Sequence, residues 1–168
     1  MTIIVKNKVT LVYEDFVFNC CTGKKGLTKN KIEGDKKTPK GTFSLGNLYY
    51  RKDRNPKPLT KLKCISIRKS MGWCNDIKNK KYYNKLIKIN KKIKHEKLYR
   101  NDHKYDYIIL IEYNYKRIIK NKGSAIFIHI AKKNYEKTQG CVAVKKLDLL
   151  KILKKIKVKT KVKIERQK

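Results

Sequence analysis

The sequence predicts a mainly β domain of the β-rich α+β class, with few short helices and one late helix near residues 145–156. Short apolar runs of strand length recur along the chain and are separated by turn residues. Only one segment shows a clear helical period. The length of 168 residues is that of one domain, so we expect a single domain over 1–168.

The amino-terminal part reads as short strands followed by a long irregular segment. Apolar runs at 3–5, 9–13 and 16–19 are split by Lys-Asn-Lys and Glu-Asp turns, and each predicts a strand. Residues 21–46 are rich in Gly, Thr and Lys and are expected to be mostly loop, with a strand resuming at 42–45. Long loops in compact domains are often functional.

The middle of the chain is less regular. Residues 51–61 contain two prolines and are expected to be loop, and 62–68 alternates like a strand. Residues 69–106 have no clean period, so we expect turns there with a short helix. Two apolar runs, 107–113 and 124–131, predict buried strands.

The carboxy-terminal part changes period twice. Residues 145–156 predict an amphipathic helix, whose apolar stripe consists of Leu147, Leu150 and Leu153 with Leu149 and Ile156. Residues 158–164 alternate strictly between β-formers and lysines. This alternation predicts a half-exposed strand whose lysines protect an edge of the sheet.

The charge is unusual. The 46 Lys and Arg residues against 13 Asp and Glu give a net charge of +33, but a chain that is 40% hydrophobic is not a disordered polycation. Excess basic charge favours anionic partners. However, 40 of the basic residues are Lys spread along the whole chain and six are Arg, whereas nucleic-acid readers favour Arg. The composition therefore argues against nucleic acid, and the lack of 18 consecutive apolar residues argues against a membrane span.

The cysteines and histidines predict no metal site. Five cysteines form no Cys-x-x-Cys pair, and three histidines add no second closely spaced pair of ligands. An odd number of cysteines in a chain of this size argues against a disulfide framework. We interpret Cys20, Cys21 and Cys64 as small buried hydrophobic residues in strands.

One pair of residues can carry chemistry. His129 lies in an apolar strand, and Cys141 follows twelve residues later, after a polar loop. If the flanking segments pair as neighbouring strands, the loop returns Cys141 to the vicinity of His129. An imidazole can take the thiol proton, and backbone N–H groups at Gly140 and Cys141 can hold an oxyanion. The alternative is a hydrogen-bonded core histidine and a cysteine that serves packing.

The residues around this pair resemble the catalytic domain of the L,D-transpeptidase, or YkuD-like, family. His129 followed by Thr-Gln-Gly-Cys-Val at 138–142 is similar to the family signature. The resemblance extends in order through Gly-Trp-Cys-Asn-Asp at 72–76, which is similar to the Gly-Trp-Cys-Asp-Asp block of one branch of the family. Further matching blocks are 34–43, 83–84, 96–100, 105–107 and 123–129.

This resemblance implies a fold and a reaction. The fold would be a mixed-sheet sandwich or barrel, with Cys141 as nucleophile, His129 as general base and the Ile130 carbonyl orienting the base. The substrate would be the tetrapeptide stem of peptidoglycan. Cys141 would form a thioester with the third residue and release D-alanine, and no metal or organic cofactor would take part.

Three positions near the nucleophile are also compared with the family by the resemblance. Thr138 occupies the family's Ser/Thr position. Gln139 stands where many members have His, and Ala143 stands where many have Arg or Asn. Gln139 can donate a hydrogen bond but cannot carry a proton. The two departures bear on what the resemblance implies for the acceptor more than on what it implies for the thiol.

Four more residues are candidates for contact with the stem peptide, and each has a structural alternative. Trp73 would wall the cleft or belong to the core. Tyr83 and Asn84 form part of the branch motif. Arg100 would pair with a substrate carboxylate, for which its planar guanidinium is suited, or with an Asp nearby.

The acceptor of the acyl group stays open. An amine acceptor would make the protein a cross-linking transpeptidase that works in the periplasm or cell wall, whereas water would make it a cytoplasmic L,D-carboxypeptidase of peptidoglycan recycling. The first residues show no secretory signal, so the compartment is undetermined. A different class of function is a non-catalytic basic protein that binds wall polymer or nucleic acid.

Overall fold

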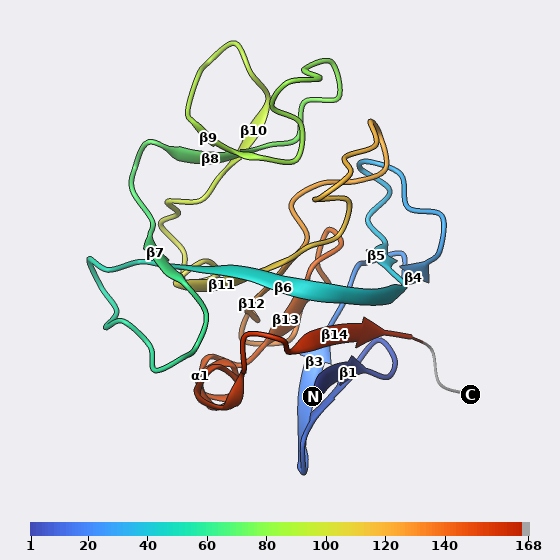
Figure 1. Cartoon of the computed structure of the whole chain (residues 1–168), viewed down its shortest axis with the longest axis vertical. Coiled ribbons are helices and arrows are strands. Elements are labelled where there is room, and N and C mark those ends of the chain that lie inside the picture. Colours follow the sequence, from blue (N-terminus) through green and yellow to red (C-terminus); the bar gives the residue numbers. More distant parts are fainter. Residues whose placement is uncertain (166–168) are drawn as a thin grey trace.

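A nine-stranded mixed sheet closed into a barrel dominates the structure, a computed structural model that describes residues 1–165 (Figure 1). The strand order is β11-β12-β13-β3-β2-β1-β14-β6-β7, and a further pairing of β6 with β11 closes the ring. These strands are β1 (Thr2–Val5), β2 (Thr10–Tyr13), β3 (Phe16–Cys21), β6 (Gly41–Tyr50), β7 (Cys64–Ser66), β11 (Tyr107–Ile111), β12 (Phe127–Ile130), β13 (Val142–Val144) and β14 (Lys161–Ile164). The expected mainly β fold is confirmed.

Two smaller sheets and one helix complete the fold. The three-stranded sheet β10-β8-β9 stands apart from the barrel in the upper part of Figure 1. The remaining elements are β4 (Leu27–Thr28), β5 (Thr38–Pro39), β8 (Met71–Cys74), β9 (Leu86–Lys88), β10 (His95–Lys97) and α1 (Lys146–Lys155). Within residues 1–165, no helix is both long and apolar enough to cross a membrane.

Strands β11, β12 and β13 are buried on both faces, which explains their continuous apolar sequences. Because side chains alternate along a strand, Ile109, Ile128 and Val142 join one core cluster. This inner cluster also contains Leu149, Ile152 and Leu153 of α1. The intervening side chains point to the opposite face, where they form a second, outer cluster: Ile108, Leu110, Phe127 and Cys141 with Trp73 and Tyr105.

The predicted strands at the amino terminus and the late helix are confirmed. The stripe predicted for the helix was partly wrong, because Leu147 is 72% exposed while Ile152 is buried. The buried residues of the helix are Leu149, Ile152 and Leu153, so the face that packs against the barrel is rotated from the predicted stripe.

Two other predictions were wrong. Residues 69–106 contain three short strands and no helix, because strands of three or four residues joined by long Lys- and Asn-rich loops leave no period to detect. The strand predicted at 158–164 is not an edge strand, because β14 lies between β1 and β6. Its Lys161 and Lys163 are exposed, as expected. Val158, which is 74% exposed, lies before the first residue of the strand.

Candidate active site

The register of two parallel strands places His129 and Cys141 on the same face of the sheet. β12 pairs with β13 so that Ile128 lies opposite Val142 and His129 opposite Ala143. Because side chains alternate, His129 points to the face opposite that of Ile128, and Cys141 points to the face opposite that of Val142. Both residues therefore face the outer cluster, and the expected pairing of the two flanking segments is present.

The Cys141 thiol is buried and hydrogen-bonded. Its Sγ donates to the Ala125 carbonyl at 3.3 Å and accepts from the Phe127 N–H at 3.4 Å. Burial raises the pKa of the thiol to about 11, although the positive charge of Lys104 acts in the opposite direction. The resting group at neutral pH is therefore the thiol.

The His129 ring is held in one orientation. Its Nδ1 lies 2.9 Å from the Ile130 carbonyl, which can only accept, so Nδ1 carries the proton and Nε2 carries the lone pair. Nε2 is buried and has no hydrogen-bond partner in the described part of the chain. Burial first, and then the charge of Lys104, lower the pKa of His129 to about 3. The imidazole is thus a neutral base with a free lone pair.

The turn before Cys141 is fixed by Thr138. Thr138 Oγ1 donates to the Cys141 carbonyl at 2.6 Å and accepts from the Gly140 N–H at 3.1 Å. Gly140 has a φ of 142°, and a Cβ there would lie 2.9 Å from the Lys37 carbonyl oxygen. The position therefore requires glycine. The Gly140 N–H, a candidate oxyanion donor, is engaged with Thr138 in this structure.

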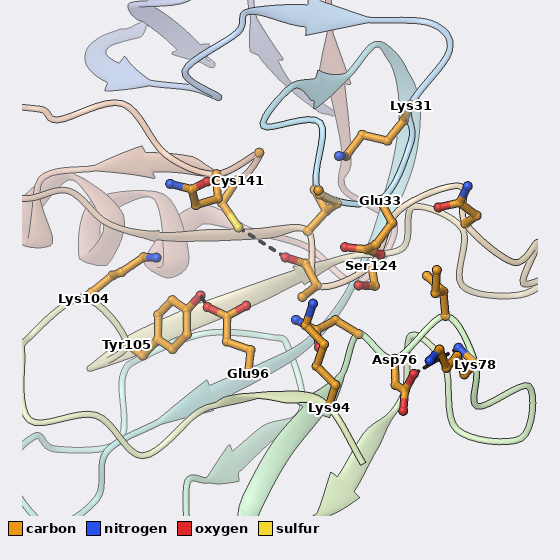
Figure 2. Close-up of a pocket in the computed structure, with 18 residues that line it drawn as sticks. Lys31, Glu33, Asp76, Lys78, Lys94, Glu96, Lys104, Tyr105, Ser124 and Cys141 are labelled. Carbon is orange, nitrogen blue, oxygen red and sulfur yellow. Dashed lines mark hydrogen bonds between the residues drawn. The ribbon is translucent and has the colours of Figure 1, made fainter. Parts of the chain in front are cut away.

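Two cavities flank the pair. The larger, of about 670 Å³, includes Cys141 and Gly140 in its wall, and Figure 2 shows Lys104 and Tyr105 on one side of Cys141 with Lys31 and Glu33 on the other. The smaller, of about 200 Å³, includes His129 in its wall. Lys104 and Gln139 line both. The larger volume lies within the ~300–1,000 Å³ typical of ligand pockets, and the smaller lies below it.

Trp73 and Asn84 lie behind the larger cavity, not in its lining. Trp73 is fully buried, and its Nε1 donates to Asn84 Oδ1 at 2.9 Å. The same oxygen accepts from the Ala125 N–H at 3.0 Å. Because Ala125 also holds the thiol, these two residues support the wall on which Cys141 rests. Of the two expectations for Trp73, a wall of the cleft or a residue of the core, the structure therefore shows the second.

Tyr83 and Arg100 have partners of their own. The Tyr83 hydroxyl donates to Glu33 at 2.5 Å and accepts from the Gly123 N–H at 3.0 Å. Glu33 lines the larger cavity and Tyr83 does not, so Tyr83 supports the cavity wall through Glu33. Arg100 lines the smaller cavity and forms an ion pair with Asp102 at 2.6 Å.

Sequence reasoning missed several residues of the site. Lys104 lies between the cavities, but nothing in the sequence separates it from 39 other lysines. Tyr105 belongs to a recognised block, and its ring lies 5.6 Å from the His129 ring while its hydroxyl donates to Glu96. Ala125 has a φ of 53°, which no sequence pattern announces. Among residues 1–165, no three His, Cys, Asp or Glu side chains are grouped so that they could hold a metal ion.

Comparisons with known proteins identify the family and the fold of the chain. The family model YkuD, described as the L,D-transpeptidase catalytic domain, matches residues 1–164. A solved structure similar in fold is the helical cell shape determining protein Pgp2 from Campylobacter jejuni, with a TM-score of 0.51 and 16% identity over 99% of this chain and 48% of that one. A lysine-to-alanine mutant of Pgp2 matches with a TM-score of 0.49 and 16% identity, over 99% and 47% of the two chains. The chain thus spans about half the length of these structures. At 16% identity, the likeness to the first structure shows the fold alone. No curated protein matches the chain.

Proposed function

The chain belongs to the L,D-transpeptidase catalytic domain family of peptidoglycan enzymes, and we propose that it transfers the acyl group of a tetrapeptide stem through a thioester at Cys141. The observation that carries this proposal is the placement of one thiol and one oriented, neutral imidazole on the same face of adjacent strands. Both groups border cavities, and the larger cavity can hold an extended peptide.

The first half of the reaction uses both groups. Cys141 Sγ attacks the carbonyl of the third stem residue while its proton passes to His129 Nε2. The bond to D-alanine then breaks, and Nε2 returns the proton to the leaving amine. Because the pKa of the thiol is raised and that of the imidazole is lowered, the proton moves only when a carbonyl is in place to accept the sulfur.

The second half regenerates the thiol. An acceptor gives its proton to Nε2 and attacks the thioester, and the sulfur leaves with that proton. An amine acceptor yields a cross-linked or exchanged peptide, which is transpeptidation. Water yields a tripeptide, which is L,D-carboxypeptidation. Both reactions share the same nucleophile and base.

The test combines a defined disaccharide-tetrapeptide with intact mass spectrometry and product analysis, with and without an added D-amino acid. We expect a Cys141-dependent acyl adduct and release of D-alanine. Cys141→Ala should abolish both, while Cys64→Ala, a cysteine outside the cavity linings, should retain them. Tripeptide as the sole product would identify a carboxypeptidase, and exchange or dimer formation would identify a transpeptidase.

Absence of any adduct, even with a carbapenem, would refute the enzymatic proposal. If the protein then bound wall polymer in a salt-sensitive manner that Cys141→Ala did not change, a non-catalytic binding function would replace it.

A further inference from the structure

The two cavities differ in charge. The larger has four lysines and three carboxylates in its wall: Lys31, Lys78, Lys94 and Lys104 with Glu33, Asp76 and Glu96. The smaller has five cations and one carboxylate: Lys24, Arg100, Lys104, Lys132 and Lys137 with Glu136. Glu136 already pairs with Lys132 at 2.7 Å. Arg100 pairs with Asp102 at 2.6 Å. Three lysines of the smaller cavity, Lys24, Lys104 and Lys137, form no ion pair within the described residues. The cavity beside His129 therefore has a net positive charge, whereas the one beside Cys141 is mixed.

Lys104 is the cation common to both cavities. It is half-buried, and its Nζ lies 4.9 Å from the centre of the Tyr105 ring, which in turn contacts the His129 ring. Its backbone carbonyl accepts from the Ile130 N–H at 3.2 Å, so its position is tied to the strand that carries the base. Within the described residues, no carboxylate forms an ion pair with its ammonium.

A second feature of the smaller cavity indicates a ligand. His129, in its wall, is 2% exposed, and its Nε2 has no hydrogen-bond partner among residues 1–165. A buried acceptor without a partner is costly unless a bound molecule satisfies it. The Nε2 lone pair needs a donor, which the N–H of a leaving amine can supply, whereas the unpaired Lys104 ammonium needs an anion. A ligand that carries both an amine and a carboxylate would satisfy the two groups.

From these features we propose that the cavity beside His129 is a carboxylate-binding subsite, with Lys104 as its central cation, that holds the free carboxylate of the substrate's terminal D-residue. The assignment of the ligand rests on the proposed function. His129 must reach the leaving amine to return its proton, so the leaving residue lies on the His129 side of the cleaved bond. Its carboxylate then falls among the cations, and about 200 Å³ accommodates one small residue.

This placement also restricts the substrate class. A peptide whose terminal carboxylate is blocked leaves Lys104 without a partner, so cleavage is limited to the last residue of the stem. After the D-residue leaves, the same cavity favours water or an amino acid with a free carboxylate as acceptor. The ammonium side chain of a second stem would meet repulsion from the unpaired Lys24, Lys104 and Lys137.

Alkylation of Cys141 by two reagents tests the charge without requiring turnover. Iodoacetate carries a carboxylate and iodoacetamide does not, and both react with the same thiolate, so the ratio of their rate constants cancels any change in the pKa of Cys141. In each reaction an S–C bond forms, iodide leaves and the thiol proton goes to solvent. Modification is measured at Cys141 by peptide mass spectrometry.

We expect Lys104→Met to lower the iodoacetate-to-iodoacetamide ratio by about tenfold, and Lys104→Arg to retain it. Lys159→Met removes the same charge from an exposed turn outside both cavities and should change the ratio by less than about twofold. An unchanged ratio in Lys104→Met, with iodoacetamide still reacting, would overturn the proposal whether or not the protein is an enzyme.

A substrate comparison then tests the ligand. The wild type should have a kcat/KM at least about tenfold higher for a tetrapeptide with a free terminal carboxylate than for its terminal amide, and Lys104→Met should bring the two within about threefold. Equal values in the wild type would overturn the assignment of the ligand. The wild type could instead show no turnover while the iodoacetate-to-iodoacetamide ratio still depends on Lys104. That result would refute the proposed function and leave the anion site in place.

Discussion

The two faces of β11, β12 and β13 are both buried, but they differ in chemistry. The inner face presents Ile109, Ile128 and Val142 to a cluster of buried, mainly aliphatic side chains. The outer face presents Phe127, His129 and Cys141 to a layer of aromatic and charged side chains. One strand pairing thus supports stability on one side and holds reactive groups on the other.

Burial has a different consequence on each of the two faces. On the inner face, burial removes apolar area from water and stabilises the fold. On the outer face, the same exclusion of water keeps Cys141 protonated and His129 neutral. We therefore expect substitutions on the inner face to affect stability and substitutions on the outer face to affect chemistry.

The largest expected effect is on the outer face. Cys141→Ala should abolish the acyl adduct and release of D-alanine, because no other thiol borders the two cavities flanking His129. It should leave the free energy of unfolding within about 1–2 kcal/mol of the wild-type value, since one buried sulfur is lost. Product analysis and urea unfolding check the two parts. Retained turnover would show that the reactive group lies elsewhere.

The next effect concerns pH. Because burial raises the pKa of Cys141 to about 11, the iodoacetamide rate constant at Cys141 should rise by about tenfold per pH unit between pH 7 and 10. His129→Gln should not change that profile, since the imidazole is neutral throughout this range. A plateau near pH 7 that disappears in His129→Gln would indicate a thiolate–imidazolium pair instead.

The same raised pKa has a consequence for stability. The folded protein retains a proton that the unfolded chain loses above about pH 8.5. The contribution of Cys141 to stability is therefore present below that pH and is lost as pH rises toward 11. The difference in Tm between wild type and Cys141→Ala should change across this window and stay constant from pH 6 to 8.

On the inner face, Ile128→Ala should lower the free energy of unfolding by about 2–5 kcal/mol, because it opens a cavity among fully buried aliphatic side chains. The iodoacetamide rate constant of the folded variant should stay within about threefold of wild type. Urea unfolding and alkylation below the unfolding transition provide the measurements. A decrease of the iodoacetamide rate constant by more than about threefold in the folded variant would show that the two faces are not independent.

A smaller effect is expected where the outer face is supported from behind. Asn84→Ala leaves the Trp73 Nε1–H and the Ala125 N–H without their acceptor, which should cost about 1–3 kcal/mol. It should also change the reactivity of Cys141, whose Sγ rests on the Ala125 carbonyl. Asn101→Ala, at an exposed position, is the control and should do neither. Unchanged alkylation in Asn84→Ala would limit its role to stability.

Much of the site followed from residue types and spacing. The apolar runs around His129 and Cys141 predicted two buried strands, and the polar loop between them predicted their return to one neighbourhood. The three strands within 69–106 could not be predicted, because each pairs with residues distant in sequence and has too few residues to show a period. The interior position of β14 was missed for a different reason. An edge strand and an interior strand with one solvent-exposed face show the same alternation of lysines with apolar residues, so the pattern does not distinguish them.

By itself, then, the sequence determined which strands form around His129 and Cys141 and made these two side chains the candidates for catalysis, because alternation and residue chemistry are local properties. Only the tertiary structure decided that Trp73 and Asn84 support the wall from behind, that Ala125 holds the thiol, and that Lys104 is the lysine placed between the two cavities. These depend on contacts between segments far apart in the chain. Among 40 lysines, position in space alone distinguishes the one that faces the reacting groups.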